Sequence, residues 1–517
     1  MFLLNMSSFF SKIKFALQQY KILTSIIFSF ILIASALIFS PFRFEENDDI
    51  IMLLLASGNY TGDFESNLIF INPIYGFIVS GLYQLIKGVE WYTFLFVFFH
   101  LISFSIVIHY VISLLINNRL KLILVILLSV IELNLIMYLQ FTTVSILLTL
   151  AGIILFSKSN KIGLISSFFF ILLAGLIRYE AVLLILLLFF PYYIYDSLKS
   201  KKANKIIIYI SFLLIVVSVR YISYGLMSKE WKEFTEFNKL RGKVTDNPNA
   251  DLKTSIYKDI CTKEDYLLLK KYFPDPSVFS NSKMEKLVEN VQIKNDYKII
   301  VKNVINQIKD YKHELIILFF IVVFVLIGTR TNFPNKYVYM YVLFVLSVLI
   351  FISMDGLLKN RVFIGVLLSA ILLFMFTLEK MTNNFYINCI SILFIVLSVF
   401  YVRRLSEKIE ETNFIRINSI PHHISIINDF FDKEPDKYLI PFGDDLRVQY
   451  INPFHISKTV KNWNLFYLGW MTKSPHNNSI MNSFSFFRKD GFIYISRYNY
   501  NVLCPLIKDS TTQYIVY

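Results

Sequence analysis

The stretch Ile22–Ser40, ILTSIIFSFILIASALIFS, decides the fold class of this chain. About twenty mostly apolar residues are enough for a helix to cross the hydrocarbon core of a bilayer. Immediately after it comes PFRF and then the acidic run Glu45-Glu46-Asn47-Asp48-Asp49. Four acids next to a membrane span are expensive to hold near hydrocarbon. The run therefore indicates a site at the membrane face rather than a plain connector.

Composition extends this interpretation to the whole chain. The 517 residues are 56% hydrophobic and 17% aromatic, with a mean hydropathy of +0.56. Soluble domains are less apolar and lack long uninterrupted apolar runs. We therefore predict an all-α polytopic membrane protein without a cleavable signal peptide. The net charge of +14 does not point to a nucleic-acid partner, because basic residues of membrane proteins usually mark cytoplasmic loops.

Apolar segments of spanning length recur along the chain, and we predict eleven spans. They are Ile22–Ser40, Trp91–Ile116, Leu120–Tyr138, Thr143–Phe156, Ile162–Ile177, Ala181–Tyr195, Ile206–Tyr224, Leu315–Gly328, Tyr337–Met354, Val362–Leu378 and Phe385–Val402.

A twelfth segment, Asn72–Ile86, is shorter and is interrupted by a proline and two glycines. If it spanned the membrane, the lysine-rich loops at 119–121, 158–161 and 199–205 would all lie outside. If it lies along the outer surface as a juxtamembrane helix, those loops lie inside, as the positive-inside rule requires. The second arrangement predicts a cytoplasmic amino terminus and an extracytoplasmic carboxyl terminus in the plasma (inner) membrane.

This topology divides the chain into three parts. Residues 1–21 form a cytoplasmic leader, and residues 22–402 form the transmembrane domain. The transmembrane domain includes a first outer loop at 41–90, with the juxtamembrane helix, and a large outer loop at 228–313. Residues 403–517 are predicted to form a small extracytoplasmic α/β domain. Its expected elements are a helix at Ile420–Asp432 and strands at Tyr438–Phe442, Gly491–Ser496 and Gln513–Val516.

The acidic run precedes a predicted helix, Ile50–Ser57, for which Asn47 could be the cap and the acids could simply favour the helix dipole. Asp48 and Asp49 are adjacent, so on a helix their side chains diverge by about 100° and cannot enter one pocket together. One of the two is the candidate catalytic acid, while Glu45 and Glu46 support it.

Other charged residues are predicted to share the same outer face. Arg178-Tyr179-Glu180 lies between two apolar spans, and its cation could bind a phosphate while its carboxylate orients that cation. The alternative is a hairpin whose charges merely reach water. Arg220 lies near the outer end of a span, where snorkelling to ordinary headgroups is the competing interpretation. The remaining candidates are Lys359, Arg361, Asp355 and Glu132.

Carboxylates together with arginines at the membrane face fit sugar transfer from a lipid-linked donor. Cations stabilise a polyprenyl phosphate as it departs, and a carboxylate takes the proton of the attacking hydroxyl. The expected partners are a polyprenyl-phosphate-linked sugar, membrane lipids, and a cell-surface glycan, lipid or protein as acceptor. A divalent cation, Mg²⁺ or Mn²⁺, could bridge acid and phosphate through Asp48, Asp49 or Glu180.

The order of segments resembles the GT-C class of integral-membrane glycosyltransferases. The residues that carry the resemblance are the acidic run, the stretch 57–62, Asn72-Pro73-Ile74-Tyr75-Gly76 and Arg178-Tyr179-Glu180. The segment NKLRGKVTD at 238–246, with Glu264-Asp265-Tyr266, is also similar to external loops of uncharacterised bacterial members. The resemblance implies that Asp48 or Asp49 is the catalytic base or acceptor-binding acid. It also implies a second outer acid at the turn 140–143, which here reads Gln-Phe-Thr-Thr, so that Glu180 or Glu132 would replace it or metal dependence would be absent.

Two other classes of function compete with a glycosyltransferase. A transporter of lipid-linked saccharide would place charges near the bilayer midplane and often shows internal repeats, which this sequence lacks. A polymerase or ligase of surface polysaccharide would also use a large external loop, but would depend on basic and histidine residues rather than on acids in the first loop.

Overall fold

Long helices make up most of the computed structural model of the chain. It describes residues 2–158, 160–200, 203–247, 254–293, 297–310, 315–316, 319, 335–355, 359–378, 384–443, 445–481, 491–504 and 513–517. The long apolar helices are α1 (Phe2–Phe39), α4 (Trp91–Ser113), α5 (Asn118–Met137), α6 (Phe141–Ser157), α7 (Lys161–Ser200), α8 (Ala203–Leu226), α15 (Asn335–Asp355), α16 (Asn360–Leu378) and α17 (Asn384–Asn418).

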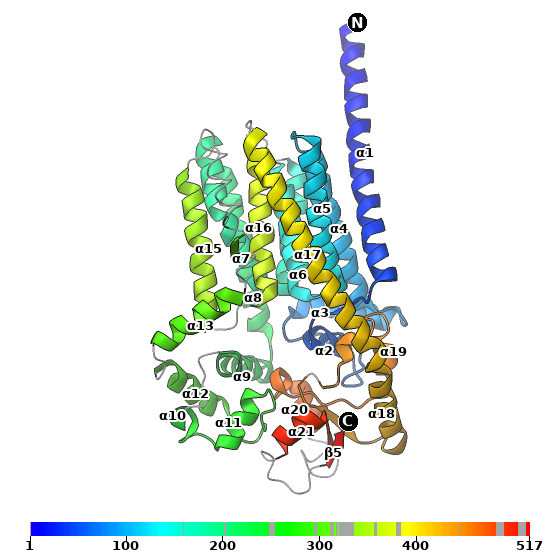
Figure 1. Cartoon of the computed structure of the whole chain (residues 1–517), viewed down its shortest axis with the longest axis vertical. Helices are drawn as coiled ribbons and strands as arrows, with labels where there is room; N and C mark the ends of the chain where they lie inside the picture. Colours follow the sequence, from blue (N-terminus) through cyan, green and yellow to red (C-terminus); the bar gives the residue numbers. More distant parts are fainter. Residues whose placement is uncertain are drawn as a thin grey trace.

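Shorter elements form a second layer across one end of the bundle (Figure 1). Its helices are α2 (Asn47–Ala56), α3 (Pro73–Leu85), α9 (Lys229–Thr245), α10 (Thr254–Tyr257), α11 (Lys263–Lys270), α12 (Asn281–Ile293), α13 (Tyr297–Asp310), α18 (Ile420–Lys433), α19 (Ile456–Thr459), α20 (Pro475–Met481) and α21 (Arg497–Leu503). Its strands are β1 (Arg43–Phe44), β2 (Tyr138–Leu139), β3 (Tyr438–Pro441), β4 (Gly491–Ile495) and β5 (Gln513–Val516), with 3₁₀ turns η1 (Val448–Tyr450) and η2 (Gly469–Met471).

Six helices of the described part of the chain are long and apolar enough to cross a membrane. The protein is thus a mostly helical, multi-pass membrane protein. Ten of the eleven predicted spans fall within α1, α4–α8 and α15–α17, because α7 contains two of them. The apolar stretches of α6, α15 and α16 are shorter than the other spans. Most of the predicted span Leu315–Gly328 lies outside the described residues, so the number eleven stays a prediction.

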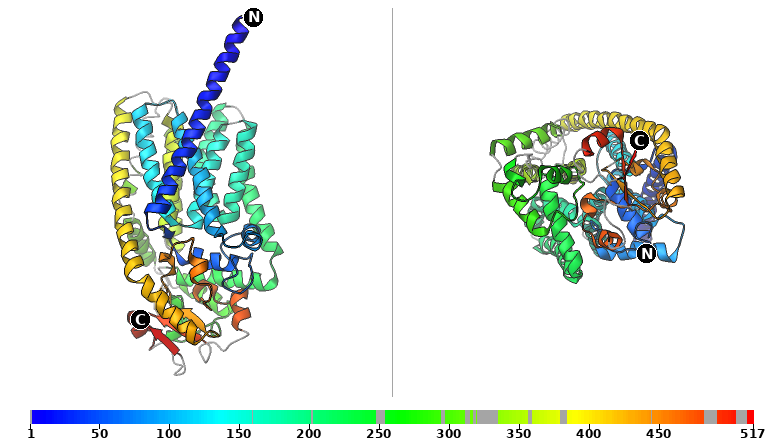
Figure 2. Two further views of the ribbon diagram at one scale, coloured as in Figure 1. Left: turned by 90° about the vertical axis from the view of Figure 1, so that its right-hand side faces the viewer. Right: turned by 90° about the horizontal axis from the view of Figure 1, so that it is seen from below.

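The described residues of the segments predicted to face outward lie at the same end of the bundle (Figure 1). Figure 1 shows α1 leaving the bundle at the opposite end, where the amino terminus lies, whereas the carboxyl terminus lies in the second layer. Figure 2 shows the same separation after a quarter turn of the view. The arrangement agrees with the alternation expected from the charge pattern, while the side of the membrane on which each end lies stays a prediction.

The predicted juxtamembrane segment is helix α3. Asn72 caps it by accepting a hydrogen bond from the backbone N–H of Ile74 at 3.0 Å, and proline occupies the first helical position, where its missing N–H costs nothing. One face of α3 buries Tyr75, Gly76 and Val79, and the other exposes apolar side chains, including Phe77 at 72%. A helix with an apolar exposed face is suited to lie in the membrane interface.

The tail contains a small α/β region, as predicted from its alternating sequence. Strands β3, β4 and β5 form a parallel sheet in that order, with Leu439 paired to Phe492 and Ile493 paired to Tyr514. Helix α18 precedes the sheet and buries Ile427 and Phe431. The predicted strand and helix positions in this region are therefore confirmed to within a few residues.

The layer is attached to the bundle by buried polar contacts. Parallel strands β1 and β2 pair Arg43 with Tyr138, which ties the start of the first outer loop to the end of α5. In the tail, Ser457 donates to Glu90 at the start of α4 at 2.9 Å, and Asn477 accepts from Tyr60 at 2.8 Å. Such contacts between distant segments fix the tail over the end of the bundle.

The two glycines of α3 provide a test of this packing. A β-carbon on Gly76 would overlap the backbone carbonyl of Ser66, whereas Gly81 has nothing within 4 Å. We expect Gly76→Ala to destabilise the protein by roughly 1–3 kcal/mol through overpacking, and to lower its Tm in detergent. Gly81→Ala is the matched control and should leave Tm unchanged or raise it slightly. Equal melting temperatures for the two variants would contradict this placement of α3.

Candidate active site at the end of the bundle

A cavity of about 790 Å³ lies between the bundle and the second layer. This volume is in the range of pockets that enclose small-molecule ligands. Its lining comes from the first outer loop, from α6, α7 and α16, from the large loop and from the tail. The predicted site residues that line it are Glu45, Glu46, Asp48, Arg178, Glu180, Lys359 and Arg361. Segments separated by hundreds of residues thus bring acids and cations into one space.

Helix α2 separates the two adjacent aspartates, as the helical spacing predicts. Asp48 lines the cavity and is partly buried. Asp49 is fully buried and does not line the cavity. The helix begins at Asn47, and Glu46 occupies the N-cap position without a capping hydrogen bond from its side chain. The capping role that the sequence suggested for Asn47 therefore does not describe this helix start.

Asp49 holds α2 to the bundle. Its Oδ1 accepts hydrogen bonds from the hydroxyl of Tyr92 at 2.9 Å and from the backbone N–H of Phe141 at 3.1 Å. Burial raises the pKa of Asp49 well above its usual range, and these two hydrogen bonds oppose the shift only in part. A neutral, proton-carrying Asp49 fits this dry environment.

The acids of the cavity wall also take up protons more readily than free carboxyls. Burial raises the pKa of Asp48, and the nearby charge of Glu46 adds to the rise, while Arg361, Lys359 and Arg178 oppose it. Burial likewise raises the pKa of Glu45 against the opposing charge of Lys408. A carboxylate with a raised pKa accepts a proton more readily near neutral pH, as a general base requires.

Arg178 lies at a break in α7. Its φ of −152° and ψ of 93° are extended, so the helix stops and restarts there. The guanidinium Nε lies 3.1 Å from Glu180 Oε2, and its carbon lies 5.7 Å and 5.4 Å from the ring centres of Phe70 and Phe141. Its side chain keeps 25% of its exposure, which leaves part of the guanidinium open to the cavity.

The second group of cations lies at the start of α16. Arg361 Nη1 lies 3.2 Å from Glu46 Oε1, and Lys359 Nζ lies 3.9 Å from Glu46 Oε2. One glutamate therefore faces two cations, and the charges of Arg361 and Lys359 also act on Asp48. Asp355 ends α15 just before these residues, and its side chain lies outside the described residues.

Three helix amino termini add to the positive potential of these cations. The first turns of α2, α6 and α16 all contribute residues to the cavity lining. The amino-terminal end of a helix carries about half a positive elementary charge. Gln140 already caps α6 by accepting from the N–H groups of Thr142 and Thr143 at 2.8 Å and 3.3 Å. The turn that lacks the second acid expected from the resemblance therefore uses its glutamine as a cap.

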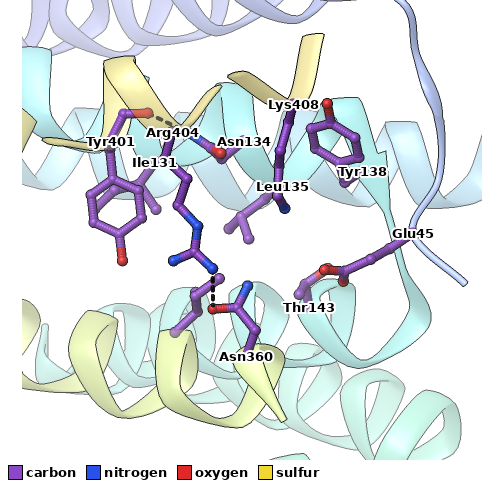
Figure 3. A pocket seen from close by; sticks show the side chains of 11 residues that line it. Glu45, Ile131, Asn134, Leu135, Tyr138, Thr143, Asn360, Tyr401, Arg404 and Lys408 are labelled. Atoms are coloured by element: carbon purple, nitrogen blue, oxygen red, sulfur yellow. Dashed lines mark hydrogen bonds between the residues drawn. The ribbon is translucent and has the colours of Figure 1, made fainter. Parts of the chain in front are cut away.

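Glu45 also borders a smaller pocket toward α5 and α17 (Figure 3). Lys408 and Arg404 of α17 enter that pocket from one side, and Asn360 from the other, where it accepts from Arg404 at 3.4 Å. The pocket has a volume of about 20 Å³, so it has room for a single water molecule. It is a polar extension of the site rather than a separate ligand site.

Besides Asp49, the predicted residues Glu132, Arg220 and Tyr179 lie away from the cavity lining. Glu132 pairs with His100 inside the bundle, with Oε1 and Nδ1 2.8 Å apart, because the two face each other across α5 and α4. Arg220 lies over the ring of Tyr179 at 5.1 Å, and neither residue lines the cavity.

The structure also adds lining residues that the sequence did not single out individually. Arg241, Asp246 and Tyr272 come from the large loop, and Trp470 comes from the tail. Arg241 and Asp246 lie inside the segment NKLRGKVTD, whose similarity to other external loops was the one available signal. No such signal marked Trp470, because only the folded tail brings it beside Phe70, with ring centres 4.8 Å apart. Within the described ranges no group of three or more His, Cys, Asp or Glu side chains is placed to hold a metal ion.

The buried carboxyl of Asp49 predicts a specific dependence of stability on pH. Because its pKa is raised in the folded state, its contribution is complete at low pH and is lost as pH rises toward the folded pKa. Asp49→Asn keeps an oxygen for both hydrogen bonds and needs no proton. We expect the Tm of Asp49→Asn to fall less than that of the wild type between pH 5 and pH 8. In free energy of unfolding, the wild type should lose up to about 1.4 kcal/mol more per pH unit than the variant.

The control for this measurement is Asp63→Asn, which changes an exposed aspartate of the same loop and should keep the wild-type slope. A variant at position 49 with the wild-type slope, or one that fails to fold, would contradict the neutral form of Asp49.

Comparisons with known proteins give one structural match. No family model matches the chain, and no curated protein matches it. A crystal structure of ArnT from Cupriavidus metallidurans bound to undecaprenyl phosphate matches 93% of this chain and 94% of its own, with 12% identical residues and a TM-score of 0.39. ArnT is a glycosyltransferase of the GT-C class, which is the class that the order of segments resembles. At this TM-score the likeness assigns no function to the chain, and the geometry of the cavity is what points to one.

Proposed function

We propose that the protein is a membrane glycosyltransferase that moves a sugar from a polyprenyl phosphate to an acceptor hydroxyl. The observation that carries the proposal is the cavity at the end of the bundle, where Asp48 faces Arg178, Lys359 and Arg361. Such a transfer needs a carboxylate that takes up the proton of the hydroxyl and cations that stabilise the departing phosphate. This partly dry cavity holds both.

The cations suit the phosphate of the donor. Arg361 keeps only 12% of its side-chain exposure, so its charge is poorly screened by water. It shares Glu46 with Lys359, and its charge also acts on Asp48 and Glu45. An incoming phosphate could bind between Arg361 and Lys359, and the amino terminus of α16 would favour it further.

Asp48 suits the role of general base. An acceptor hydroxyl would attack the anomeric carbon of the sugar while the bond between that carbon and the phosphate oxygen breaks. The hydroxyl proton would pass to the carboxylate of Asp48, and the electron pair of the broken bond would leave on the phosphate. Arg178, Lys359 and Arg361 would stabilise the negative charge that develops there.

The apolar part of the cavity suits the isoprenoid chain. On the bundle side the lining consists of Ile51, Ile146, Ala181, Leu184, Ile352 and Val362. These side chains come mainly from the helices that continue into the membrane. A lipid bound with its phosphate at Arg361 could therefore leave its tail among apolar groups, which explains why the site is built at the end of spanning helices.

The position of the cavity favours sugar transfer over transport of a lipid-linked saccharide. A transporter is expected to bind its substrate near the membrane midplane, between broken helices. Here the mixed acid and cation cavity is lined by residues of the second layer and of the helix ends next to it. The acceptor, which is proposed to be a cell-surface glycan, lipid or protein, would enter from that layer.

Asp48→Asn tests the proposed base. The variant keeps the size of the side chain but cannot take up the proton, so the transfer rate should fall about 10²–10⁴-fold. The measurement is the transfer of radiolabelled sugar from undecaprenyl phosphate donors to a membrane-fraction acceptor, with protein quantity and Tm checked in parallel. Asp63→Asn serves as the control and should keep full activity. Retention of full activity by Asp48→Asn would refute the assignment.

Arg361→Gln tests the phosphate site. Loss of a charged hydrogen-bond donor to phosphate should cost about 1.5–3 kcal/mol, which raises the KM for the lipid donor about 10–100-fold. Arg403→Gln is the matched control, because Arg403 is 82% exposed and pairs with Glu407 on its own helix. An unchanged KM in Arg361→Gln, or an equal rise in both variants, would contradict a phosphate at Arg361.

A further inference from the structure

The large loop presents a polar wall to the cavity, opposite the acidic run. It is formed by Arg241, Asp246 and Tyr272, which we call the loop triad. The loop folds around its own core, which includes Phe237, Leu269 and Met284. The triad therefore stands on a packed element and not on a mobile connection.

The guanidinium of Arg241 is engaged mainly by contacts within the loop. It is 5% exposed, and its Nε donates to Asn238 Oδ1 at 3.0 Å while its Nη1 donates to Thr245 Oγ1 at 2.9 Å. Its guanidinium carbon lies 5.8 Å from the ring centre of Tyr272. The charge of Asp246 is close enough to act on it, so this wall carries no surplus positive charge.

Asp246 is held in place from two sides. Its Oδ1 accepts from the hydroxyl of Tyr272 at 2.6 Å, and its backbone N–H closes α9 by donating to Gly242 at 2.9 Å. Lys270 donates to the carbonyls of Val244 and Thr245 at 2.9 Å and 3.2 Å, which clamps the end of α9 against α11. The carboxylate is thus fixed while it is only partly buried at the cavity wall.

Tyr272 adopts a strained backbone conformation. Its φ of +58° is in the left-handed region, where a residue other than glycine costs about 1 kcal/mol or more. A β-carbon on Gly469 of the tail would lie 3.4 Å from the carbonyl oxygen of Tyr272, so the tail packs directly on this backbone. The conformation ends α11, because the N–H groups of Tyr272 and Phe273 donate to the carbonyls of Leu269 and Leu268 at 3.1 Å and 2.9 Å, as in a Schellman motif.

The triad and Asp48 act on one another across the cavity. The charge of Asp48 influences both Arg241 and Tyr272, as expected for groups that share one space. Between them lies a site with a carboxylate on each side and one 40% exposed tyrosine ring. Carboxylates accept hydrogen bonds from hydroxyls and repel acidic groups.

From this arrangement we infer that the loop triad binds the transferred sugar, and that this sugar carries hydroxyls but no acidic group. The inference rests on the proposed function, because it assumes that the donor phosphate occupies the Arg361 side. Asp246 would accept hydrogen bonds from the sugar hydroxyls, and Tyr272 would place its ring beside the sugar. A uronic acid would instead meet the two carboxylates of Asp48 and Asp246.

The test is a binding measurement on the full-length protein in nanodiscs. The probes are bare undecaprenyl phosphate and the same lipid linked to glucose, galactose, mannose, N-acetylglucosamine or glucuronic acid. The wild type should bind at least one neutral sugar lipid about tenfold more tightly than the bare lipid, and should show no such gain with glucuronic acid. Asp246→Asn and Tyr272→Leu, which removes the ring, should each lose most of this gain while they bind the bare lipid like the wild type.

Asp259→Asn is the matched control, because Asp259 is exposed on the same loop and does not line the cavity. It should behave like the wild type. The inference is overturned if no neutral sugar lipid binds better than the bare lipid, if the glucuronic acid lipid binds best, or if the Asp246 and Tyr272 variants keep the gain. It is also overturned if these variants weaken binding of the bare lipid equally, since that pattern indicates a structural role. Failure of the wild type to bind bare undecaprenyl phosphate would contradict the proposed function itself.

Discussion

The buried carboxyl of Asp49 is the contact on which the rest of the site depends. It joins three segments that are distant in the chain, because it accepts from Tyr92 on α4 and from the backbone of Phe141 at the start of α6. Beside it, the short parallel pair of β1 and β2 fixes the chain that enters α2. Together these contacts place α2 across the end of the bundle, so that its next acid, Asp48, faces the cavity. The contacts of Asp49 thus determine where Asp48, the proposed base, lies.

Charge in the cavity is divided between two walls. The bundle side holds Arg178, Lys359 and Arg361, which pair with Glu180 and Glu46. The loop side holds Asp246 and a guanidinium already used by its own helix. Asp48 lies between them. A ligand with a negative end and a hydroxyl-rich end would match this division, and a polyprenyl phosphate sugar has both.

Much of the fold could be predicted from sequence because its signals are local. Apolar runs of spanning length marked the helices, and alternating residues marked the strands of the tail, such as Gly491–Ile495. The divergence of Asp48 and Asp49 followed from helical geometry alone. The distribution of positive loops also predicted which segments share one end of the bundle.

What could not be predicted depends on long-range packing. The pairing of Glu132 with His100 depends on how α4 and α5 face each other, which no local pattern specifies. The same holds for Trp470, which reaches Phe70 only because the tail folds back over the first loop. Whether Arg220 would line the cavity or lie on Tyr179 was likewise decided by the rotation of α8.

The most direct test of a shared phosphate and acid site is a structure with bound lipid. Electron cryomicroscopy of the protein in nanodiscs with undecaprenyl phosphate would locate the phosphate relative to Arg178, Arg361 and Asp48. We expect the phosphate within hydrogen-bond distance of at least one of the two arginines, with the isoprenoid chain among Leu184 and Ile352. A phosphate at the opposite end of the bundle, or outside the cavity along α17, would contradict the central claim.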